Sequence, residues 1–317
     1  MKNFAYLQAD SFAAASKALA KGEGHVAKGA GTDLLDFLKN RIVEPDAVVT
    51  LNRIRDEERR GEISALATLH DIATDEWTKL EFPALQQAAE IAATPQVRHV
   101  GTLGGNLGQM SRCWYLRTPG HKCIKLGSDE CAAAADAGES RYSGIFASNG
   151  CHCAHPSNLA PALIALNATA QCVHPDGDRA MDVELLYDDV RKGRMSDLAL
   201  RPGELIRAVA LTPSALTRNS VYIEFRERQS FDFAIASVAA AAEIVDGKVK
   251  DVRIVCGGVA TKPLRAVAAE QALVGKALNP EVAAAAVVQG AQPLAHNKYK
   301  VTVLAELVRR ACKEIAS

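Results

Sequence analysis

The chain has 317 residues, of which 48% are hydrophobic, and its 37 lysines and arginines balance 37 aspartates and glutamates. This balance excludes the long-range positive field that gathers nucleic acid or anionic lipid, so we expect neither partner. The eight cysteines are too few for a disulfide scaffold.

The N-terminal segments predict short strands that alternate with helices. FAYLQA, SFAAASKALAK and HVAKGAGT suggest strand, helix and strand, with Ser11 as the helix N-cap, and Asp33–Lys39 suggests a short helix. AVVTLNRI is apolar enough for a buried strand, and EISALATLHDIAT joins a strand to a helix. A further helix is predicted over Phe82–Ala93, ending before Pro95.

Residues 112–153 show no lasting periodicity and are rich in Gly, Pro, Ser and Asp. An irregular stretch of this length inside a compact domain is normally functional. Beyond it, NLAPALIALNA predicts a helix, and QCVHP and ELIRAVAL predict strands.

The C-terminal segments group strands first and helices after. VYIEFRER, FDFAIASVAAAAEIV and KVKDVRIVCGGVA predict an antiparallel sheet with a hairpin at an Asp-Gly turn, followed by the two helices RAVAAEQALVG and TVLAELVRRACKEIA. This order indicates an α+β fold. We expect an N-terminal domain over residues 1–215, in two parts of about 1–55 and 56–215, and a C-terminal domain over residues 216–317.

No membrane span or targeting segment is expected. The apolar tract Ala283–Val288 is far below the ~18 residues of a spanning helix, and the first twenty residues do not read as a secretory signal. The default compartment is cytoplasmic, and a periplasmic location would require export with a signal-bearing partner.

Two glycine-rich loops are candidate phosphate sites. Lys28-Gly29-Ala30-Gly31-Thr32-Asp33 lies between a predicted strand and helix, and Gly101-Thr102-Leu103-Gly104-Gly105-Asn106 adds a hydroxyl donor. Neither is a GxGxxG or Walker loop. Each alone reads more readily as a tight turn, but the two together favour a pyrophosphate-containing cofactor.

Five cysteines fall in or beside the irregular stretch. Cys113-x9-Cys123-x7-Cys131-x19-Cys151 offers four thiolates, and Cys153 competes with Cys151 for the last place. Soft sulfur ligands select zinc, copper(I) or iron–sulfur clusters. Spacing alone leaves a cluster and zinc evenly matched, whereas disulfides would be plausible only after export.

Other polar residues have two interpretations each. Ser157 or Asn158 can cap the following helix or hydrogen-bond a cofactor. Arg226, Arg228 and Asp232 can form a solvated charge run or line a cleft.

Taken together, AKGAGTDLLDFLK, VRHVGTLGGNL, RPGELIRAV, RERQSFDFAIASVAAA and GGVATKPLRAVAAEQALVG resemble the FAD-binding medium subunit of the molybdenum hydroxylases. This family comprises xanthine dehydrogenase, aldehyde oxidoreductase and carbon monoxide dehydrogenase. The resemblance covers nearly the whole chain and implies a two-part, PCMH-like FAD-binding domain followed by a flavoprotein C-terminal domain.

The resemblance also implies which residues bind FAD. Members with a cysteine-rich insertion resemble the flavin subunits of 4-hydroxybenzoyl-CoA reductase and of periplasmic aldehyde oxidoreductases, in which the loop holds a 4Fe-4S cluster. SRCWYLRTPGHKC and DECAA look most like the aldehyde enzyme. The implied FAD residues are Lys28, Gly29, Ala30, Gly31, Thr32, Asp33, Leu34, Gly101, Thr102, Gly104, Gly105, Asn106, Ser157 and Asn158, and the implied cluster ligands are Cys113, Cys123, Cys131 and Cys151.

The implied function is electron transfer with no catalytic residue on this chain. Electrons would pass from 2Fe-2S clusters on a small subunit to FAD and then to an acceptor, while the substrate reacts on a molybdenum-cofactor large subunit. The assembly would be a heterotrimer or its dimer. Two alternatives remain: a flavin subunit of the 4-hydroxybenzoyl-CoA reductase type, and a zinc-stabilised nucleotide-binding module.

Overall fold

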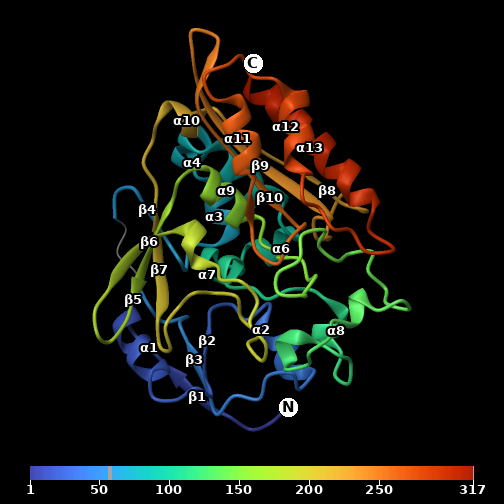
Figure 1. The fold of residues 1–317 in the computed structure, drawn as a ribbon. Coiled ribbons are helices and arrows are strands. Elements are labelled where there is room, and N and C mark those ends of the chain that lie inside the picture. Colours follow the sequence, from blue (N-terminus) through green and yellow to red (C-terminus); the bar gives the residue numbers. More distant parts are fainter. Residues whose placement is uncertain (56–58, 317) are drawn as a thin grey trace.

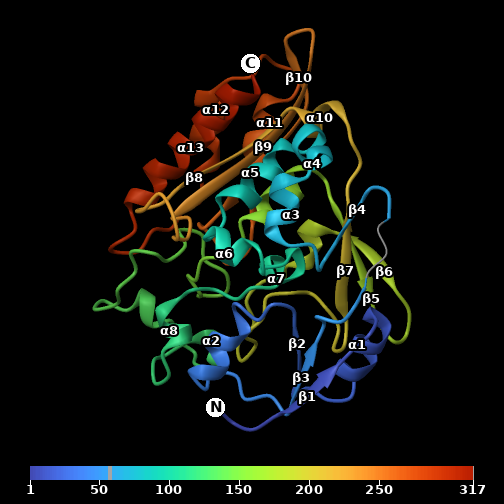
Figure 2. The same cartoon turned by 180° about the vertical axis from the view of Figure 1, so that it is seen from behind.

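The computed structural model describes residues 1–55 and 59–316, arranged around three sheets (Figures 1 and 2). Helices and sheets are mixed, which confirms the predicted α+β class. The expected division of the N-terminal domain at about residue 56 falls on residues 56–58, which lie outside the described residues. No helix among the described residues is both long and apolar enough to cross a membrane.

The first sheet is parallel, with strand order β1-β3-β2. Its strands are β1 (Ala5–Gln8), β2 (His25–Lys28) and β3 (Ala47–Thr50), and its helices are α1 (Phe12–Leu19) and α2 (Leu34–Lys39). The Ser11 side chain accepts a hydrogen bond from the Ala14 N–H at 3.1 Å, which confirms the predicted N-cap.

The second sheet is antiparallel, with strand order β4-β7-β5-β6. Its strands are β4 (Glu62–Ser64), β5 (Thr169–Val173), β6 (Arg179–Asp182) and β7 (Leu205–Ala210). The helices nearby in the chain are α3 (Leu69–Thr74), α4 (Glu76–Glu81), α5 (Pro83–Ile91), α6 (Pro95–Arg98), α7 (Leu103–Leu107) and α9 (Leu159–Ala165). Strand β6 escaped prediction because RAMD has no apolar alternation.

The irregular stretch holds only short elements: α8 (Trp114–Arg117) and 3-10 turns over Ile124–Leu126 and Ala132–Ala134. A further 3-10 turn spans Val183–Leu186. The short elements within residues 112–153 confirm the expectation that no regular structure persists in that stretch.

The third sheet is antiparallel, with strand order β11-β10-β9-β8. Its strands are β8 (Ser220–Phe225), β9 (Ala236–Val245), β10 (Lys248–Gly257) and β11 (Leu264–Arg265), and β9 and β10 pair across the predicted Asp-Gly turn. The helices are α10 (Ala215–Arg218), α11 (Val267–Leu273), α12 (Pro280–Val287) and α13 (Tyr299–Ile315). The two predicted C-terminal helices are present as α11 and α13. Helix α12 between them was not predicted, because its alanine run has little apolar periodicity.

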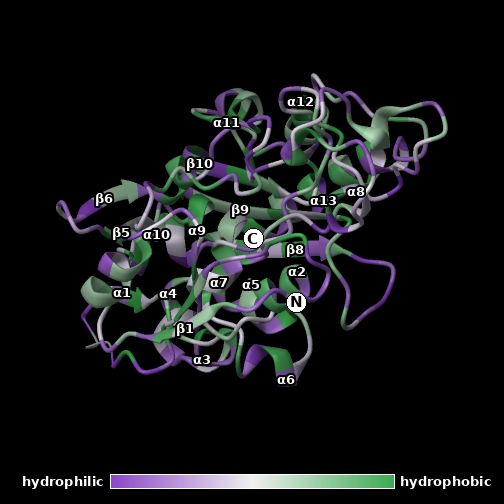
Figure 3. Ribbon diagram, turned by 90° about the horizontal axis from the view of Figure 1, so that it is seen from below, coloured by the Kyte–Doolittle hydropathy of each residue, from purple (hydrophilic) through white to green (hydrophobic). Residues whose placement is uncertain are grey.

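Both faces of the third sheet are covered (Figure 3). Helices α11, α12 and α13 cover one face, and α5 and α9 from the preceding region cover the other. In β9, Ala240 packs against the core formed with α11, α12 and α13, and Ala239 packs against the core formed with α5 and α9. A strand that is buried on both faces reads as a continuous apolar run, which explains the sequence of β9.

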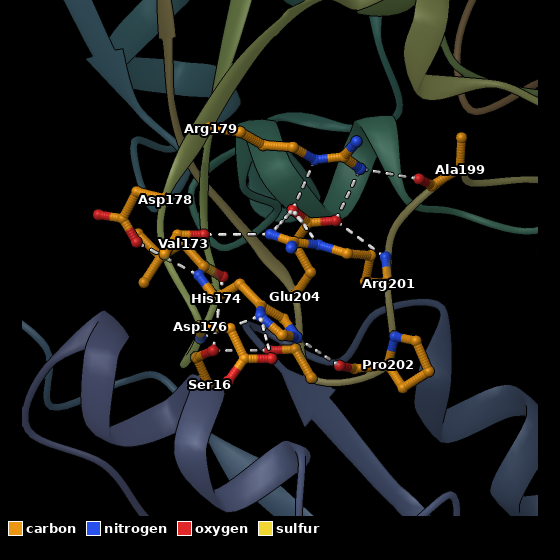
Figure 4. Close-up of polar contacts among 12 residues, drawn as sticks. Ser16, Val173, His174, Asp176, Asp178, Arg179, Ala199, Arg201, Pro202 and Glu204 are labelled. Carbon is orange, nitrogen blue, oxygen red and sulfur yellow. Dashed lines mark hydrogen bonds and ion pairs between the residues drawn. The ribbon is translucent and has the colours of Figure 1, made fainter.

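A buried carboxylate holds the turn before β7 (Figure 4). The Glu204 side chain is 0% exposed and accepts two hydrogen bonds from Arg179, both 2.8 Å, and one from the Arg201 N–H at 2.8 Å. The Ser16 hydroxyl of α1 donates to the neighbouring Gly203 carbonyl at 2.7 Å. The RPGEL segment therefore ties the first sheet to the second.

We expect Glu204→Gln to lower the free energy of unfolding by about 2 kcal/mol, below the ~3–5 kcal/mol of fully buried pairs because both arginines are partly exposed. Burial alone would raise the pKa of Glu204, but hydrogen bonds from Arg179 and Arg201 outweigh it and lower the pKa. Because the pKa of Glu204 is lower in the folded than in the unfolded protein, the ionised carboxylate stabilises the fold at pH values above its unfolded-state pKa. This stabilisation is lost as the pH falls through the folded-state pKa.

Urea unfolding at pH 7 and at pH 4 measures both effects. The difference between wild type and Glu204→Gln should shrink at the lower pH. The control is Glu281→Gln, which breaks the exposed pair with Arg309 and should change stability little. If Glu204→Gln and Glu281→Gln lowered the free energy of unfolding equally at pH 7, the stabilising role of Glu204 would be contradicted.

Candidate cofactor-binding site

The first glycine loop joins the end of β2 to the start of α2. Among the described residues, none accepts a hydrogen bond from the backbone N–H groups of residues 29–33. Gly31 has φ +85°, a left-handed conformation that favours glycine. Consecutive free N–H groups before a helix suit an anion such as a phosphate.

The second loop uses most of its N–H groups for its own fold. Thr102 caps α7, with its hydroxyl oxygen accepting from the Gly105 N–H at 3.1 Å, and the N–H groups of Leu103 and Gly104 donate to Ala67 and Ala65. Within the described part of the chain, no group accepts from the Thr102 N–H or hydroxyl proton, so both can donate to a ligand. The loop therefore has fewer free donors than its glycines predict.

The two loops meet at Gly29 and Thr102. A Cβ atom added to Gly29 would lie 3.3 Å from the Thr102 hydroxyl oxygen, a tight contact that shows how closely the two loops approach. Loops about seventy residues apart in sequence thus form one edge of a common site.

The remaining predicted FAD residues belong to a buried hydrogen-bond network. The Ser157 hydroxyl donates to the Asn106 side-chain oxygen at 2.6 Å. The Asn158 amide donates to Glu224 at 2.8 Å, and Glu224 also accepts from the Tyr222 hydroxyl at 2.7 Å. Sequence analysis missed Tyr222 and Glu224. Their only signal is polar character on a strand that is otherwise apolar.

Asp33 links the first glycine loop to the cysteine-rich stretch. Its carboxylate pairs with Arg112 at 3.0 Å and Arg117 at 2.7 Å, and it accepts from the Met110 N–H at 2.9 Å. Arg117 also pairs with Asp36 and lies over the Phe37 ring. Helices α2 and α8 accordingly lie side by side in Figures 1 and 2.

The five cysteines gather in two small adjoining cores. Cys151 and Cys153 are buried with Ile124 and Val190, and Cys113 and Cys131 pack against them. Cys123 is buried with Phe37 and Leu116, and Cys113 also touches this second core. Among residues 1–55 and 59–316, no three His, Cys, Asp or Glu side chains have the spacing of a metal site.

Backbone donors point at several of the sulfurs. The N–H groups of Tyr115 and Leu116 face Cys113, and those of Lys125 and Leu126 face Cys123. Burial and the neighbouring Cys153 raise the pKa of Cys113 to about 12, and burial raises the pKa of Cys123. These thiols stay protonated at neutral pH unless a cation replaces their protons.

Cys151 follows a tight hairpin turn, and a buried ion pair lies near Cys153. Asn149 and Gly150 both have positive φ, which lets the backbone of Ser148 and Cys151 pair across a two-residue turn. The Lys125 side chain is 1% exposed and pairs with Asp197. Burial alone would lower the pKa of Lys125, but Cys153 and Asp197 raise it overall.

A cavity of about 400 Å³ opens beside Cys113 and Cys153. Arg228 and Asp232 line it, whereas Arg226 instead pairs with Glu224 at 3.0 Å. His155 also lines this cavity, and burial lowers the pKa of its imidazole to about 3. The residues of the two glycine loops do not line it.

The other three cysteines of the chain are core residues. Cys172, Cys256 and Cys312 are buried. Burial raises the pKa of the Cys312 thiol to about 12. Buried thiols of this kind pack as small apolar groups.

Two family models match the chain. Residues 2–213 match the FAD binding domain in molybdopterin dehydrogenase, and residues 221–315 match the CO dehydrogenase flavoprotein C-terminal domain. These two matches span all three sheets.

Named relatives are subunits of oxidoreductases. The chain is 32% identical over 280 residues to the aldehyde oxidoreductase FAD-binding subunit PaoB of Escherichia coli K12, covering 86% of each chain. It is 26% identical to the glyceraldehyde dehydrogenase medium chain of Sulfolobus acidocaldarius, covering 99% of this chain and 98% of the relative.

A solved structure shares the fold. The reconstituted CO dehydrogenase from Oligotropha carboxidovorans contains a chain that superposes with a TM-score of 0.75 at 22% identity, covering 99% of this chain and 98% of that one.

Proposed function

Because the chain belongs to the family of FAD-binding subunits of molybdopterin dehydrogenases, and is thus an oxidoreductase subunit, we propose that it carries FAD and a 4Fe-4S cluster. It would relay electrons in a complex of the aldehyde oxidoreductase or xanthine dehydrogenase type. The substrate would react on a partner, and this chain would hold and orient the redox groups.

One observation carries the proposal: Asp33 binds both sides of the Cys113 segment. Asp33 is the last residue of the first glycine loop, whose N–H groups are free. Its carboxylate pairs with Arg112 and Arg117, which flank Cys113 in sequence. A phosphate site and a thiolate site are thereby joined by charged hydrogen bonds. Such proximity suits electron transfer between two groups and has no evident purpose in a protein that only binds a nucleotide.

For FAD, the first loop is the better-formed half of the site. Lys28, Gly29, Ala30, Gly31, Thr32, Asp33 and Leu34 would hold the pyrophosphate with free N–H groups, and the second loop would add Thr102. Asn106, Ser157 and Asn158 would act mainly by bracing this edge, since their side chains are already bonded to protein. FAD, when bound, supplies two-electron and one-electron chemistry.

For the cluster, the proposed ligands are Cys113, Cys123, Cys131 and Cys151. Four cysteines are the usual ligand set of a 4Fe-4S cluster, and hydrogen bonds to the sulfurs tune its potential. The N–H groups that face Cys113 and Cys123, and the buried ammonium of Lys125, would stabilise the negative charge of four thiolates. Cys151 and Cys153 lie in the same small core, beside Cys113 and Cys131, so both are candidates for the fourth position.

The proposed partners are a molybdenum-cofactor large subunit and a 2Fe-2S small subunit. The names of the relatives support an assembly of this kind, since they describe a FAD-binding subunit and a medium chain. The chain itself would contribute no nucleophile or general base.

An anaerobic absorption spectrum of the purified protein, with iron, zinc and flavin quantified on one sample, tests the proposal. We expect flavin bands above a broad iron–sulfur shoulder and about four irons per chain. Flavin without iron would remove the cluster and keep the FAD role. Stoichiometric zinc in a colourless protein would instead support the nucleotide-binding module.

A further inference from the structure

Arg117, the last residue of α8, contacts the first glycine loop and the helix that follows it. Its side chain is 11% exposed, and the guanidinium donates to the Asp33 carboxylate at 2.7 Å and to the Asp36 carboxylate at 2.5 Å. The guanidinium carbon also lies 4.2 Å from the centre of the buried Phe37 ring. This one side chain therefore holds the end of the loop and one face of α2.

The same guanidinium holds residues 109–113, which have no regular structure and join α7 to α8. Its Nε–H donates to the Ser111 carbonyl at 2.8 Å, and an Nη2 proton donates to the Met110 carbonyl at 3.1 Å. The Met110 N–H in turn donates to the Asp33 carboxylate at 2.9 Å. Helix α7 begins in the second glycine loop, so Arg117 lies where both glycine loops meet the cysteine-rich stretch.

Ser111 extends these contacts to the far end of the cysteine-rich stretch. Its hydroxyl oxygen accepts from the Cys113 N–H at 3.2 Å, and its hydroxyl proton is donated to the Ala154 carbonyl at 2.9 Å. Ala154 directly follows Cys153 in sequence. The backbone N–H of Arg117 also donates to the Cys113 carbonyl at 3.1 Å. Arg117 and its direct partner Ser111 thus touch both ends of the segment that carries the clustered cysteines.

Asp33 carries a negative charge beside the N–H groups that would hold a pyrophosphate. A carboxylate at this position repels a diphosphate unless cations compensate its charge. Arg112 and Arg117 both pair with its Oδ1, at 3.0 Å and 2.7 Å. The affinity of the first glycine loop for a diphosphate therefore depends on where these two guanidinium groups lie.

Occupation of the cysteine site would fix the segment from which both arginines come. Cys113 is a proposed cluster ligand and lies between Arg112 and Arg117 in sequence. A cluster bound to its sulfur would anchor the segment, whereas without a cluster the hydrogen bonds of Arg117 and Ser111 must hold it alone. A segment that one ligand has already ordered costs less free energy to order when a second ligand binds.

We propose that Arg117 is a positioning residue that couples the two cofactor sites, so that the chain binds FAD more tightly when the cluster is in place. The inference rests on the proposed function and deepens it, since it adds how occupation of one site regulates the other. Coupling between two binding sites is reciprocal, so bound FAD stabilises the cluster in turn.

Isothermal titration of FAD into the protein freed of flavin, with the cluster in place and after a chelator has removed the iron, tests the inference. We expect the cluster-loaded wild type to bind FAD about tenfold more tightly than the cluster-free form, within the usual range of coupling between sites. Arg117→Met should bring both affinities to the value of the cluster-free wild type. A difference of this size changes an affinity and leaves the flavin content of protein purified with excess FAD unchanged.

Two further variants separate positioning from a general loss of stability. Arg207→Met is the matched control, because the Arg207 side chain is 13% exposed and pairs with Glu62 at 2.7 Å between β7 and β4. This variant should keep the full difference between the two forms. Arg117→Lys keeps the charge but loses the planar fork that reaches four acceptors. It should hold iron and FAD and show a smaller difference than the wild type.

A reciprocal measurement needs no variant and remains informative even if Arg117→Met does not fold. Saturating FAD should lower the fraction of iron that a fixed concentration of chelator removes from the wild type. Equal FAD affinities of the two wild-type forms, an undiminished difference in Arg117→Met, or an equal loss of the difference in Arg207→Met would overturn the inference. A wild type that binds no iron or no FAD would instead overturn the proposed function, and this inference with it.

Discussion

Replacing Cys123 by serine is expected to remove the iron from the purified protein, from about four irons per chain to fewer than about one. A serine hydroxyl is a harder and weaker ligand for iron than the thiolate that the Lys125 and Leu126 N–H groups face. Iron, flavin and protein measured on one sample give the result. Flavin content should be retained, because Cys123 does not belong to the glycine loops.

The matched control is Cys312→Ala, which removes a buried sulfur from α13 and should keep all of the iron. The same assay separates the two candidates for the fourth ligand. We expect Cys151→Ser to lose iron and Cys153→Ser to retain it, following the family resemblance. Unchanged iron in Cys123→Ser would rule out the ligand set, whereas loss in Cys153→Ser alone would exchange only its last member.

Replacing Gly31 by alanine is expected to weaken FAD binding by about tenfold or more, since a left-handed backbone strains any residue with a Cβ. The added Cβ would also lie 3.0 Å from the Lys28 Cε and 3.3 Å from the Leu35 Cγ. The loop would relieve this by turning, and its free N–H groups would no longer converge. Quenching of flavin fluorescence on titration into the protein freed of FAD measures the dissociation constant.

Gly275→Ala provides the control for strain alone. Gly275 has φ +77° and no neighbour within 4 Å of an added Cβ, and it follows α11 in the C-terminal region. We expect a comparable loss of stability and unchanged FAD affinity. If both variants bind FAD as tightly as the wild type, the first loop does not hold the pyrophosphate.

Local sequence signals sufficed for most elements and for the chemistry of the candidate groups. Ser11 was predicted as an N-cap because capping depends on residues only three apart, and the β9–β10 hairpin because an Asp-Gly pair suits its turn. The glycine loops and the clustered cysteines are likewise visible without any tertiary contact. Helix α12 and strand β6 were missed, since neither carries the apolar period that would mark it.

The family also followed from the order of motifs along the chain, and the matching family models confirm it. The order of motifs can be read from the sequence alone, without knowledge of how the chain packs. It does not reveal which N–H groups stay free. Only the structure shows that most N–H groups of the second glycine loop already donate hydrogen bonds within α7 and to the chain before α3.

Tertiary structure alone decided which groups distant in sequence come into contact. Asp33 meets Arg112 and Arg117 because α2 packs beside α8, and Asn158 meets Glu224 because α9 lies on the third sheet. The hydrogen bonds from the Lys300 ammonium to the carbonyls of Tyr142 and Gly258 likewise form only after folding. Sequence determines which groups are available, but burial and long-range pairing determine which of them remain free to bind.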